Sequence, residues 1–349
     1  MRGVPIGKAF GIPIILDWSW FLVLVLFSSS LAGGYFPARF SGWPGWLYWL
    51  TGIVTALGLF GSVLLHELGH SLVARGFGVP VTRIRLFIFG GVAEMGDEWP
   101  HAGSEFLIAI AGPVVSVLTG VAAFVGWALL RVGLGMDLTM LDMAIPAPAA
   151  VLPGLLSLEA LVGVLGYLAA INVVLAVFNM VPGFPLDGGR VLRSVVWGLT
   201  GSLRQATNIA VIIGRIVAFG FIGLGVVQIV TGSLVGGLWT IFIGIFMQGA
   251  GRAEQRSQLA KGLLQERFVA HLMMHNPQIT RWAVPGLAPE ITHGKSVSPD
   301  EDLWNVLKRM ERNNIGTMPI MRDGQLLGIL RREDILGYMQ MLSAGGIRI

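Results

Sequence analysis

The 349-residue chain is 54% hydrophobic and only 13% charged. Soluble globular domains carry about 25% charged residues, so this composition excludes an ordinary soluble protein and indicates one that resides among membrane lipids. The net charge is +4, but the basic residues are spread through loops beside apolar segments, so we expect no nucleic-acid partner. The chain has no cysteine, which excludes disulfides, thiolate metal sites and cysteine nucleophiles.

Six apolar segments recur along the chain. A membrane-spanning helix needs about 20 mostly apolar residues, and all of the segments except the last reach that length. Because the last segment follows closely on its neighbour, we expect these two to form a helical hairpin. The predicted fold is an α-helical polytopic membrane protein with about six transmembrane helices, at residues 12–32, 46–72, 105–130, 157–181, 206–231 and 234–249.

The basic residues lie in alternate loops. Lys and Arg are concentrated on the cytoplasmic side of membrane proteins, and an even number of spans returns the chain to the side on which it began. We therefore expect a multi-pass protein of the plasma or inner membrane with both termini in the cytoplasm. The residues that support this topology are Arg2, Lys8, Arg75, Arg83, Arg85, Arg190, Arg193, Arg204, Arg252, Arg256 and Lys261.

A segment between the second and third spans has a different period. Residues 81–95, VTRIRLFIFGGVAEM, alternate apolar and polar side chains up to a pair of glycines. This period is typical of a strand or hairpin and not of a spanning helix. Backbone of this kind at membrane depth must be sheltered by protein or line a cavity, so we expect a small membrane-embedded β element.

The composition changes after residue 249, where charged residues become frequent. We expect a membrane-embedded domain at residues 1–249, a polar linker helix at 250–267 and a cytosolic α/β domain at 268–349. Within the last domain the pattern predicts a helix, a strand, a turn at Asp323-Gly324, a second strand and a second helix.

The strongest chemical signal is HELGH at residues 66–70, near the end of the second span. His66 and His70 are separated by four residues, so they share one helix face and both imidazoles can reach one ion. A catalytic zinc site uses three protein ligands and a water. Glu67, beside the first histidine, can take a proton from that water and return it to the leaving amine. Three ionisable groups in an apolar span are costly without a function, which favours a metal site over a chance match.

A third ligand is needed, and Asp187 in NMVPGFPLDGGR is the best candidate. It follows an apolar span, with prolines that break the helix before it and glycines that free the backbone after it. The alternative is that Asp187 only caps the next helix. Asn179, in the same segment, could donate a hydrogen bond to a developing oxyanion or could merely bridge helices.

The order of these motifs resembles the site-2 protease family of zinc intramembrane metalloproteases. HELGH within a span is followed by FIFGGV, EFLIAIAGP and NMVPGFPLDGG, and the opening GIPIILDWSWF is similar to that family's first span. The resemblance implies that His66, His70 and Asp187 bind zinc, with Glu67 as catalytic base and Asn179 nearby. It implies further that Phe89-Gly90-Gly91 form an edge that binds an unwound substrate strand, and that the substrates are single-pass transmembrane proteins cut in regulated intramembrane proteolysis.

The C-terminal segment TMPIMRDGQLLGILRREDIL resembles a CBS (cystathionine-β-synthase) domain. Such domains work in pairs and often bind adenine nucleotides. One clear copy is present, so the resemblance implies a homodimer formed by two chains. Arg331 stands where the family has a hydroxyl residue that contacts ribose, and a purely dimerising role and a nucleotide-sensing role both stay open.

A membrane transporter or channel gated by the CBS-like domain is the alternative function. In that case the HELGH histidines would form a transport ion site. A transporter needs ligands but no general base, and its halves should show inverted repeats. Glu67 therefore favours the protease.

Two further acids lie near the ends of predicted spans. Asp17 is expected to be an accessible, solvated carboxylate close to the membrane interface. Glu105, at the start of the third span, is expected to be a helix N-terminal acid that interacts favourably with the helix dipole. Neither acid is assigned to the reaction.

Overall fold

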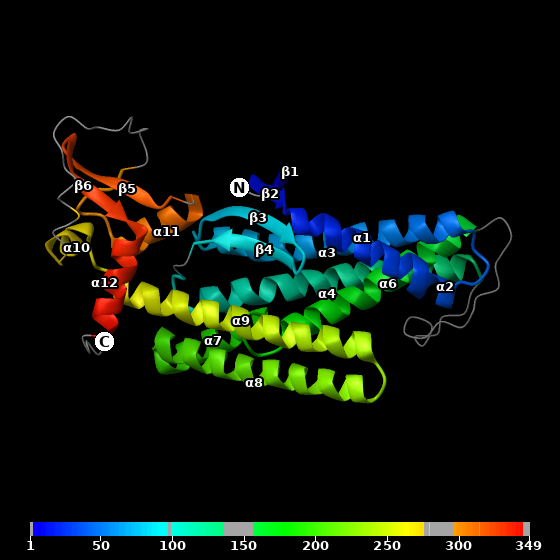
Figure 1. Ribbon diagram of the computed structural model, residues 1–349. Coiled ribbons are helices and arrows are strands. Elements are labelled where there is room, and N and C mark those ends of the chain that lie inside the picture. The colour runs from blue at the N-terminus through cyan, green and yellow to red at the C-terminus, as the bar shows by residue number, and fades with distance from the viewer. Residues whose placement is uncertain are drawn as a thin grey trace. The chain divides into compact units, whose positions relative to one another are not determined.

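The computed structural model describes residues 3–96, 99–135, 156–275, 279, 296–313 and 315–344. The chain divides into two compact units, Met1–Gly251 and Arg252–Ile349 (Figure 1). Arg2, which contributes to the predicted topology, lies outside the described residues.

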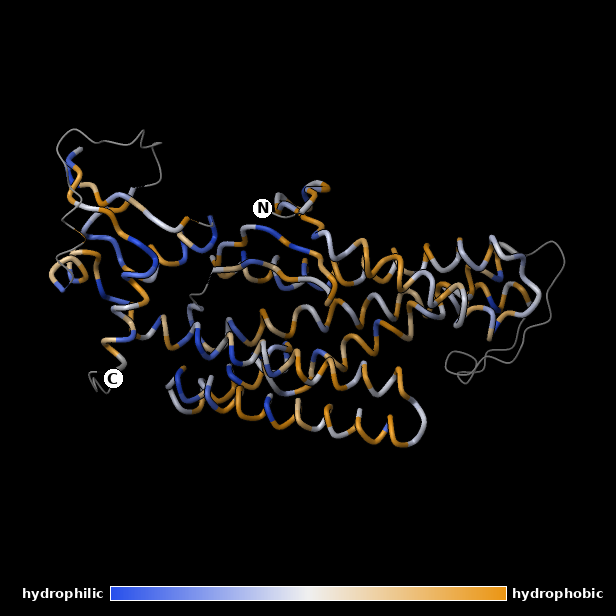
Figure 2. Tube along the Cα trace, in the orientation of Figure 1, coloured by the Kyte–Doolittle hydropathy of each residue, from blue (hydrophilic) through white to orange (hydrophobic). Residues whose placement is uncertain are grey.

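Long apolar helices make up most of the first unit. Within the described residues, six helical stretches are long and apolar enough to cross a membrane. Their outward faces carry large aliphatic side chains that are more than half exposed, such as Leu118, Val177 and Ile216, and Figure 2 shows apolar residues along the length of these helices. Lipid would cover such surfaces, and the chain is an integral membrane protein. The stretches comprise α1 (Trp18–Ser30) with the π-turn η1 (Leu31–Tyr35) and α2 (Phe36–Arg39), then α3 (Gly45–Gly76), α4 (Ala102–Gly133), α6 (Leu156–Asn179), α8 (Leu203–Val230) and α9 (Leu234–Leu264).

The first helix begins later than the sequence suggested. The expected span started at residue 12, but Ile12–Leu16 forms strand β2 and α1 begins at Trp18. The isoleucines of this segment favour an extended chain. Asp17 is the N-cap of α1, where its carboxylate accepts a hydrogen bond from the amide of Ser19 at 3.0 Å.

The β element is a four-stranded sheet and not only a hairpin. Its order is β1-β2-β3-β4, with antiparallel pairs at both sides and a parallel pair between β2 and β3. One face packs on α1 and α3 through a buried apolar cluster that includes Trp20, Phe60, Leu68 and Ile84. The strands are β1 (Val4–Ala9), β2 (Ile12–Leu16), β3 (Val81–Phe87) and β4 (Gly90–Met95), and β4 forms one outer edge of the described sheet.

Helix α4 packs against α3, α6 and the short helix α7 (Asp187–Thr200). Small residues allow the close approach. A Cβ on Gly69 of α3 would lie 3.0 Å from the carbonyl oxygen of Ala111, and one on Gly120 of α4 would lie 3.3 Å from that of Ala169. Contacts of this kind let helix backbones pack tightly in lipid, where no hydrophobic force drives them together.

The segment between α6 and α7 folds back tightly on α7. A Cβ on Gly188 would lie 2.3 Å from the carbonyl oxygen of Met180, and one on Gly189 would lie 2.4 Å from the carbonyl carbon of Gly183. No side chain fits at either position. The two glycines after Asp187 therefore allow its helix to begin directly against the preceding loop.

Helix α9 joins two elements that the sequence analysis separated. A short span at 234–249 and a distinct linker helix were expected, but one helix runs from Leu234 to Leu264. The residues from 250 to 264 include Arg, Glu, Gln, Lys and Leu, which favour continued helix, and no proline interrupts them.

The second unit has the predicted order of helix, strand, turn, strand and helix. Its strands pair antiparallel, and Asp323 and Gly324 at the turn both have positive φ, 52° and 78°, as a tight two-residue hairpin requires. The elements are α10 (Val269–His275), α11 (Leu303–Asn313), β5 (Thr317–Arg322), β6 (Gln325–Arg331) and α12 (Arg332–Ala344).

Candidate metal centre

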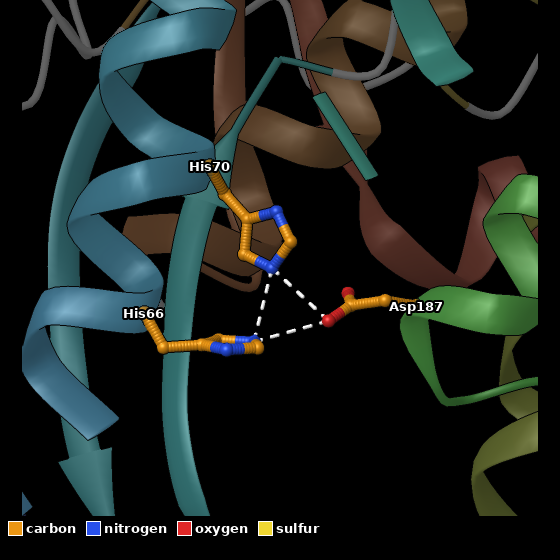
Figure 3. Close-up of side chains that lie close together, drawn as sticks. All are labelled: His66, His70 and Asp187. Atoms are coloured by element: carbon orange, nitrogen blue, oxygen red, sulfur yellow. Dashed lines mark hydrogen bonds and ion pairs between the residues drawn. The ribbon is translucent and has the colours of Figure 1, made fainter. Parts of the chain in front are cut away.

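His66 and His70 lie one helical turn apart on α3, and both are almost fully buried, at 3% and 2% exposure. Their ring planes are nearly perpendicular, at 82°, and their Nε2 atoms are 3.1 Å apart. Both imidazoles face the same point inside the helix bundle (Figure 3).

Asp187 reaches that point from α7, 117 residues later in the chain than His70. Its Oδ2 lies 3.0 Å from Nε2 of His66 and 3.1 Å from Nε2 of His70. Asp187 is the first residue of its helix and not the N-cap, which is Leu186.

Hydrogen bonds behind the rings orient both histidines. Nδ1 of His70 is 2.6 Å from the carbonyl oxygen of Ile108, and Nδ1 of His66 is 2.9 Å from Oγ of Ser116. A carbonyl oxygen only accepts, so Nδ1 of His70 carries the proton and Nε2 of the neutral ring presents a lone pair to the centre. A hydrogen bond at the ring nitrogen that faces away from the centre is typical of metal-binding histidines.

The space between the three donor atoms is kept open by Gly112 of α4. A Cβ at this position would lie 2.2 Å from Nε2 of His70 and 2.7 Å from Nε2 of His66. Two imidazoles and a carboxylate that converge on one point repel one another unless a cation lies between them. The set fits zinc, which takes nitrogen and oxygen donors and in catalytic sites has three protein ligands and one open position.

Glu67 points from α3 toward the sheet. Its Oε2 accepts a hydrogen bond from the amide of Ala93 at 3.0 Å. Gly91 of β4 lies against Glu67, and no side chain fits at position 91 because a Cβ there would lie 2.5 Å from Cγ of Glu67. The carboxylate therefore lies between the histidine face of α3 and the strand that forms the sheet edge.

The tip of the β3–β4 hairpin contacts the last span. Phe89 stacks on Phe246 of α9 with a centroid distance of 4.2 Å and lies 5.6 Å from the ring of Phe242. Gly90 begins β4 with a φ of 125°, which favours glycine. Asn179 is the half-buried last residue of α6.

Several residues of the site were missed by sequence reasoning, and all of them lie on or against α4. Ile108, Gly112 and Ser116 follow one another at intervals of four residues, so they share one face of the helix. Glu105, expected to act only as a helix N-terminal acid, is fully buried and forms an ion pair with the equally buried Arg193 of α7. Arg193, interpreted as a topology-setting loop charge, lies inside the protein.

A comparison with known families agrees with this geometry. The profile described as Peptidase family M50 matches residues 54–221, and that described as CBS domain matches residues 269–340. A Synechocystis sp. protein named as a zinc metalloprotease, sll0528, is 37% identical over 96% of this chain and 77% of its own length. The chain belongs to peptidase family M50. This is the site-2 protease family, so the protein is a zinc metalloprotease of the site-2 type, with zinc as its cofactor.

Two further proteins are similar to this chain. Rip3 of Mycobacterium tuberculosis, also named as a zinc metalloprotease, is 35% identical over 78% of this chain and 64% of its own length. Among solved structures, the site-2 protease from Methanocaldococcus jannaschii has a TM-score of 0.46 and 29% identity, over 73% of this chain and 95% of that one. Membership of a peptidase family leaves the transporter alternative without support.

Proposed function

We propose that this M50 peptidase is an intramembrane protease that hydrolyses peptide bonds within or near transmembrane segments of single-pass membrane proteins, as in regulated intramembrane proteolysis. One observation carries the proposal. The donor atoms of His66, His70 and Asp187 converge inside a bundle of apolar helices, with Glu67 beside them and a strand edge next to it.

In this proposal His66, His70 and Asp187 hold the zinc ion. Bound there, zinc supplies a Lewis acid for the substrate carbonyl and an acidified water as nucleophile. Glu67 would act as general base through its carboxylate, holding the proton released by the attacking water and passing it to the leaving amine nitrogen. Asn179, at the end of α6, donates a hydrogen bond to the oxyanion that develops.

Strand β4 supplies the binding edge for the substrate. A transmembrane helix hides its amides in internal hydrogen bonds, so the scissile bond is accessible only after local unwinding. Pairing with a sheet edge satisfies the freed amides and carbonyls where no water can do so. Phe89, Gly90 and Gly91 form the start of this edge, and the glycines let a second backbone come close.

The proposal also covers orientation and partners. Both termini lie in the cytoplasm, and the CBS unit pairs two chains in a homodimer. Whether that unit also binds an adenine nucleotide depends on Arg331, which ends β6 and whose amide donates to Oδ2 of Asp334 at 2.9 Å. The CBS unit has two candidate roles, dimerisation alone and dimerisation with nucleotide sensing.

The test is cleavage of a panel of single-pass membrane substrates by purified protein in lipid vesicles. Wild type and Glu67→Gln are compared, and the zinc content of each is measured. We expect both to hold one zinc ion per chain and only wild type to cut, with a loss of at least about 10²-fold in the variant because the general base is gone.

Glu159→Gln is a matched control. Glu159 is a buried carboxylate of α6 in the same unit, and its Oε2 accepts a hydrogen bond from the indole of Trp43. We expect this variant to keep its activity. Full cleavage by Glu67→Gln would refute the role of Glu67, and absence of zinc from wild type would refute the ligand set.

A further inference from the structure

Helix α4 contacts both histidines of the metal centre without contributing a ligand. The carbonyl of Ile108 and the hydroxyl of Ser116 orient the two histidines, and Gly112 leaves the space between them. The same helix face continues one turn toward the N-terminus to Glu105. Glu105 therefore lies on the face of α4 that also carries Ile108 and Gly112.

Glu105 does not touch Asp187 but holds the helix that carries it. Its Oε1 accepts hydrogen bonds from both Nε and Nη2 of Arg193 on α7, the first at 2.7 Å. Glu105 is 0% exposed and Arg193 is 2% exposed. A charge pair buried this deeply fixes its geometry, because neither partner can turn to water.

Arg193 also contacts the loop on the other side of Asp187. Its guanidinium lies over the ring of Phe184, 4.9 Å from the centroid. Arg193 thus binds α4 through Glu105 and the loop before α7 through Phe184. Asp187 lies between Phe184 and Arg193 in the chain, so both ends of its segment are anchored by one side chain.

We propose that Glu105 and Arg193 form a positioning pair that sets the location of the Asp187 carboxylate, so that α4 orients all three metal ligands. The inference rests on the proposed ligand set. His66 and His70 share one rigid helix, whereas Asp187 comes from a separate helix of 14 residues. The third donor is therefore the one whose distance to the other two depends on how helices dock.

The test measures metal binding by the full-length protein in detergent, with no substrate present. Zinc dissociation constants are obtained by competition with a chromophoric chelator for wild type, Glu105→Gln, Arg193→Lys and Asp187→Asn. Each protein is also loaded with Co²⁺, whose visible absorption reports the geometry of its ligands. The melting temperature of each metal-free protein reports its folding.

Glu159→Gln is the matched control. Glu159 is a carboxylate at the start of α6 that is 1% exposed and hydrogen-bonded to the indole of Trp43, so it shares burial and position in a first helical turn with Glu105. Its partner Trp43 belongs to the segment between α2 and α3. Loss of Glu159 tests the general effect of removing a buried charge.

We expect Glu105→Gln and Arg193→Lys to weaken zinc binding by about 10- to 100-fold, as is usual for residues that orient metal ligands, and to change the Co²⁺ spectrum. Asp187→Asn should bind more weakly still, and Glu159→Gln should match wild type. Unchanged affinity and spectrum in both pair variants would overturn the proposal. Failure of both to fold, with Glu159→Gln folded, would show a purely structural role and would also overturn it. If wild type and Asp187→Asn bind zinc equally, the ligand set itself fails.

Discussion

The metal centre requires a residue without a side chain at position 112, which is glycine. The residue lies on α4 beside the Nε2 atoms of His66 and His70, and its lack of a side chain leaves free the volume next to these two donor atoms. Because the contact is with the Nε2 atoms themselves, the histidines cannot move away without losing their hydrogen bonds to Ile108 and Ser116.

Gly112→Ala is therefore expected to abolish zinc binding while every ligand and the base Glu67 stay in place. The added methyl group would lie within 2.2 Å of Nε2 of His70, where real contacts do not occur. Zinc content after purification measures the effect. Gly133→Ala, at the end of the same helix where a Cβ meets nothing within 4 Å, is the control and should bind zinc normally. Equal zinc content in both variants would show that the centre does not lie over Gly112.

At the scale of elements, the sequence predicted best where the signal was local. HELGH placed His66 and His70 on one helix face, and the alternation in residues 81–95 gave the β3–β4 hairpin. The parallel pairing of β2 with β3 was missed because an apolar run of five residues merges with the apolar helix that follows it. The Glu105–Arg193 pair was missed because its partners are 88 residues apart, and no local pattern reports such a contact.

The edge of β4 leads to a prediction about substrates. If the substrate binds as an added strand, the cost of unwinding its helix enters the barrier, and residues that weaken a helix should increase the cleavage rate. Glycine costs a helix about 1 kcal/mol relative to alanine. Two Ala→Gly changes beside the scissile bond lower the cost of unwinding by about 2 kcal/mol and should thus raise kcat/KM by roughly 30-fold.

The measurement compares substrates that differ only at those two positions. The same changes placed near the far end of the substrate's transmembrane segment serve as the control, since unwinding there does not expose the scissile bond. Equal acceleration by both placements would indicate a general loss of helix stability. No acceleration by either would indicate that the substrate is cut without pairing to β4.

At the scale of the whole molecule, the spans and the basic loops together predict an orientation in the membrane. The α7–α8 connection belongs to the predicted cytoplasmic side, and the α8–α9 connection at Thr231–Ser233 belongs to the opposite side. Because the chain contains no cysteine, a single introduced thiol can report the side on which it lies without any background.

Ser233→Cys should react with a membrane-impermeant maleimide added to intact cells, because Ser233 is exposed at the loop between the last two spans. Gln205→Cys, exposed near the start of α8, should react only after the membrane is permeabilised. The reverse pattern would place both termini outside the cytoplasm. Labelling of both in detergent confirms that each thiol is reactive.

The length of α3 has a consequence for the lipid in which the protein works. Its 32 residues span about 48 Å at 1.5 Å per residue, well beyond a hydrocarbon layer of about 30 Å. His66 and His70 precede the last residue, Gly76, by ten and six positions, so they lie about 15 Å and about 9 Å from that end of the helix. Their depth is thus fixed by the protein, whereas the ends of a substrate helix follow the bilayer surface. A thicker bilayer would bring a different residue of the same substrate to the metal centre, by about one residue for each 3.3 Å of extended chain. Membrane thickness would then determine which peptide bond of the substrate is cut.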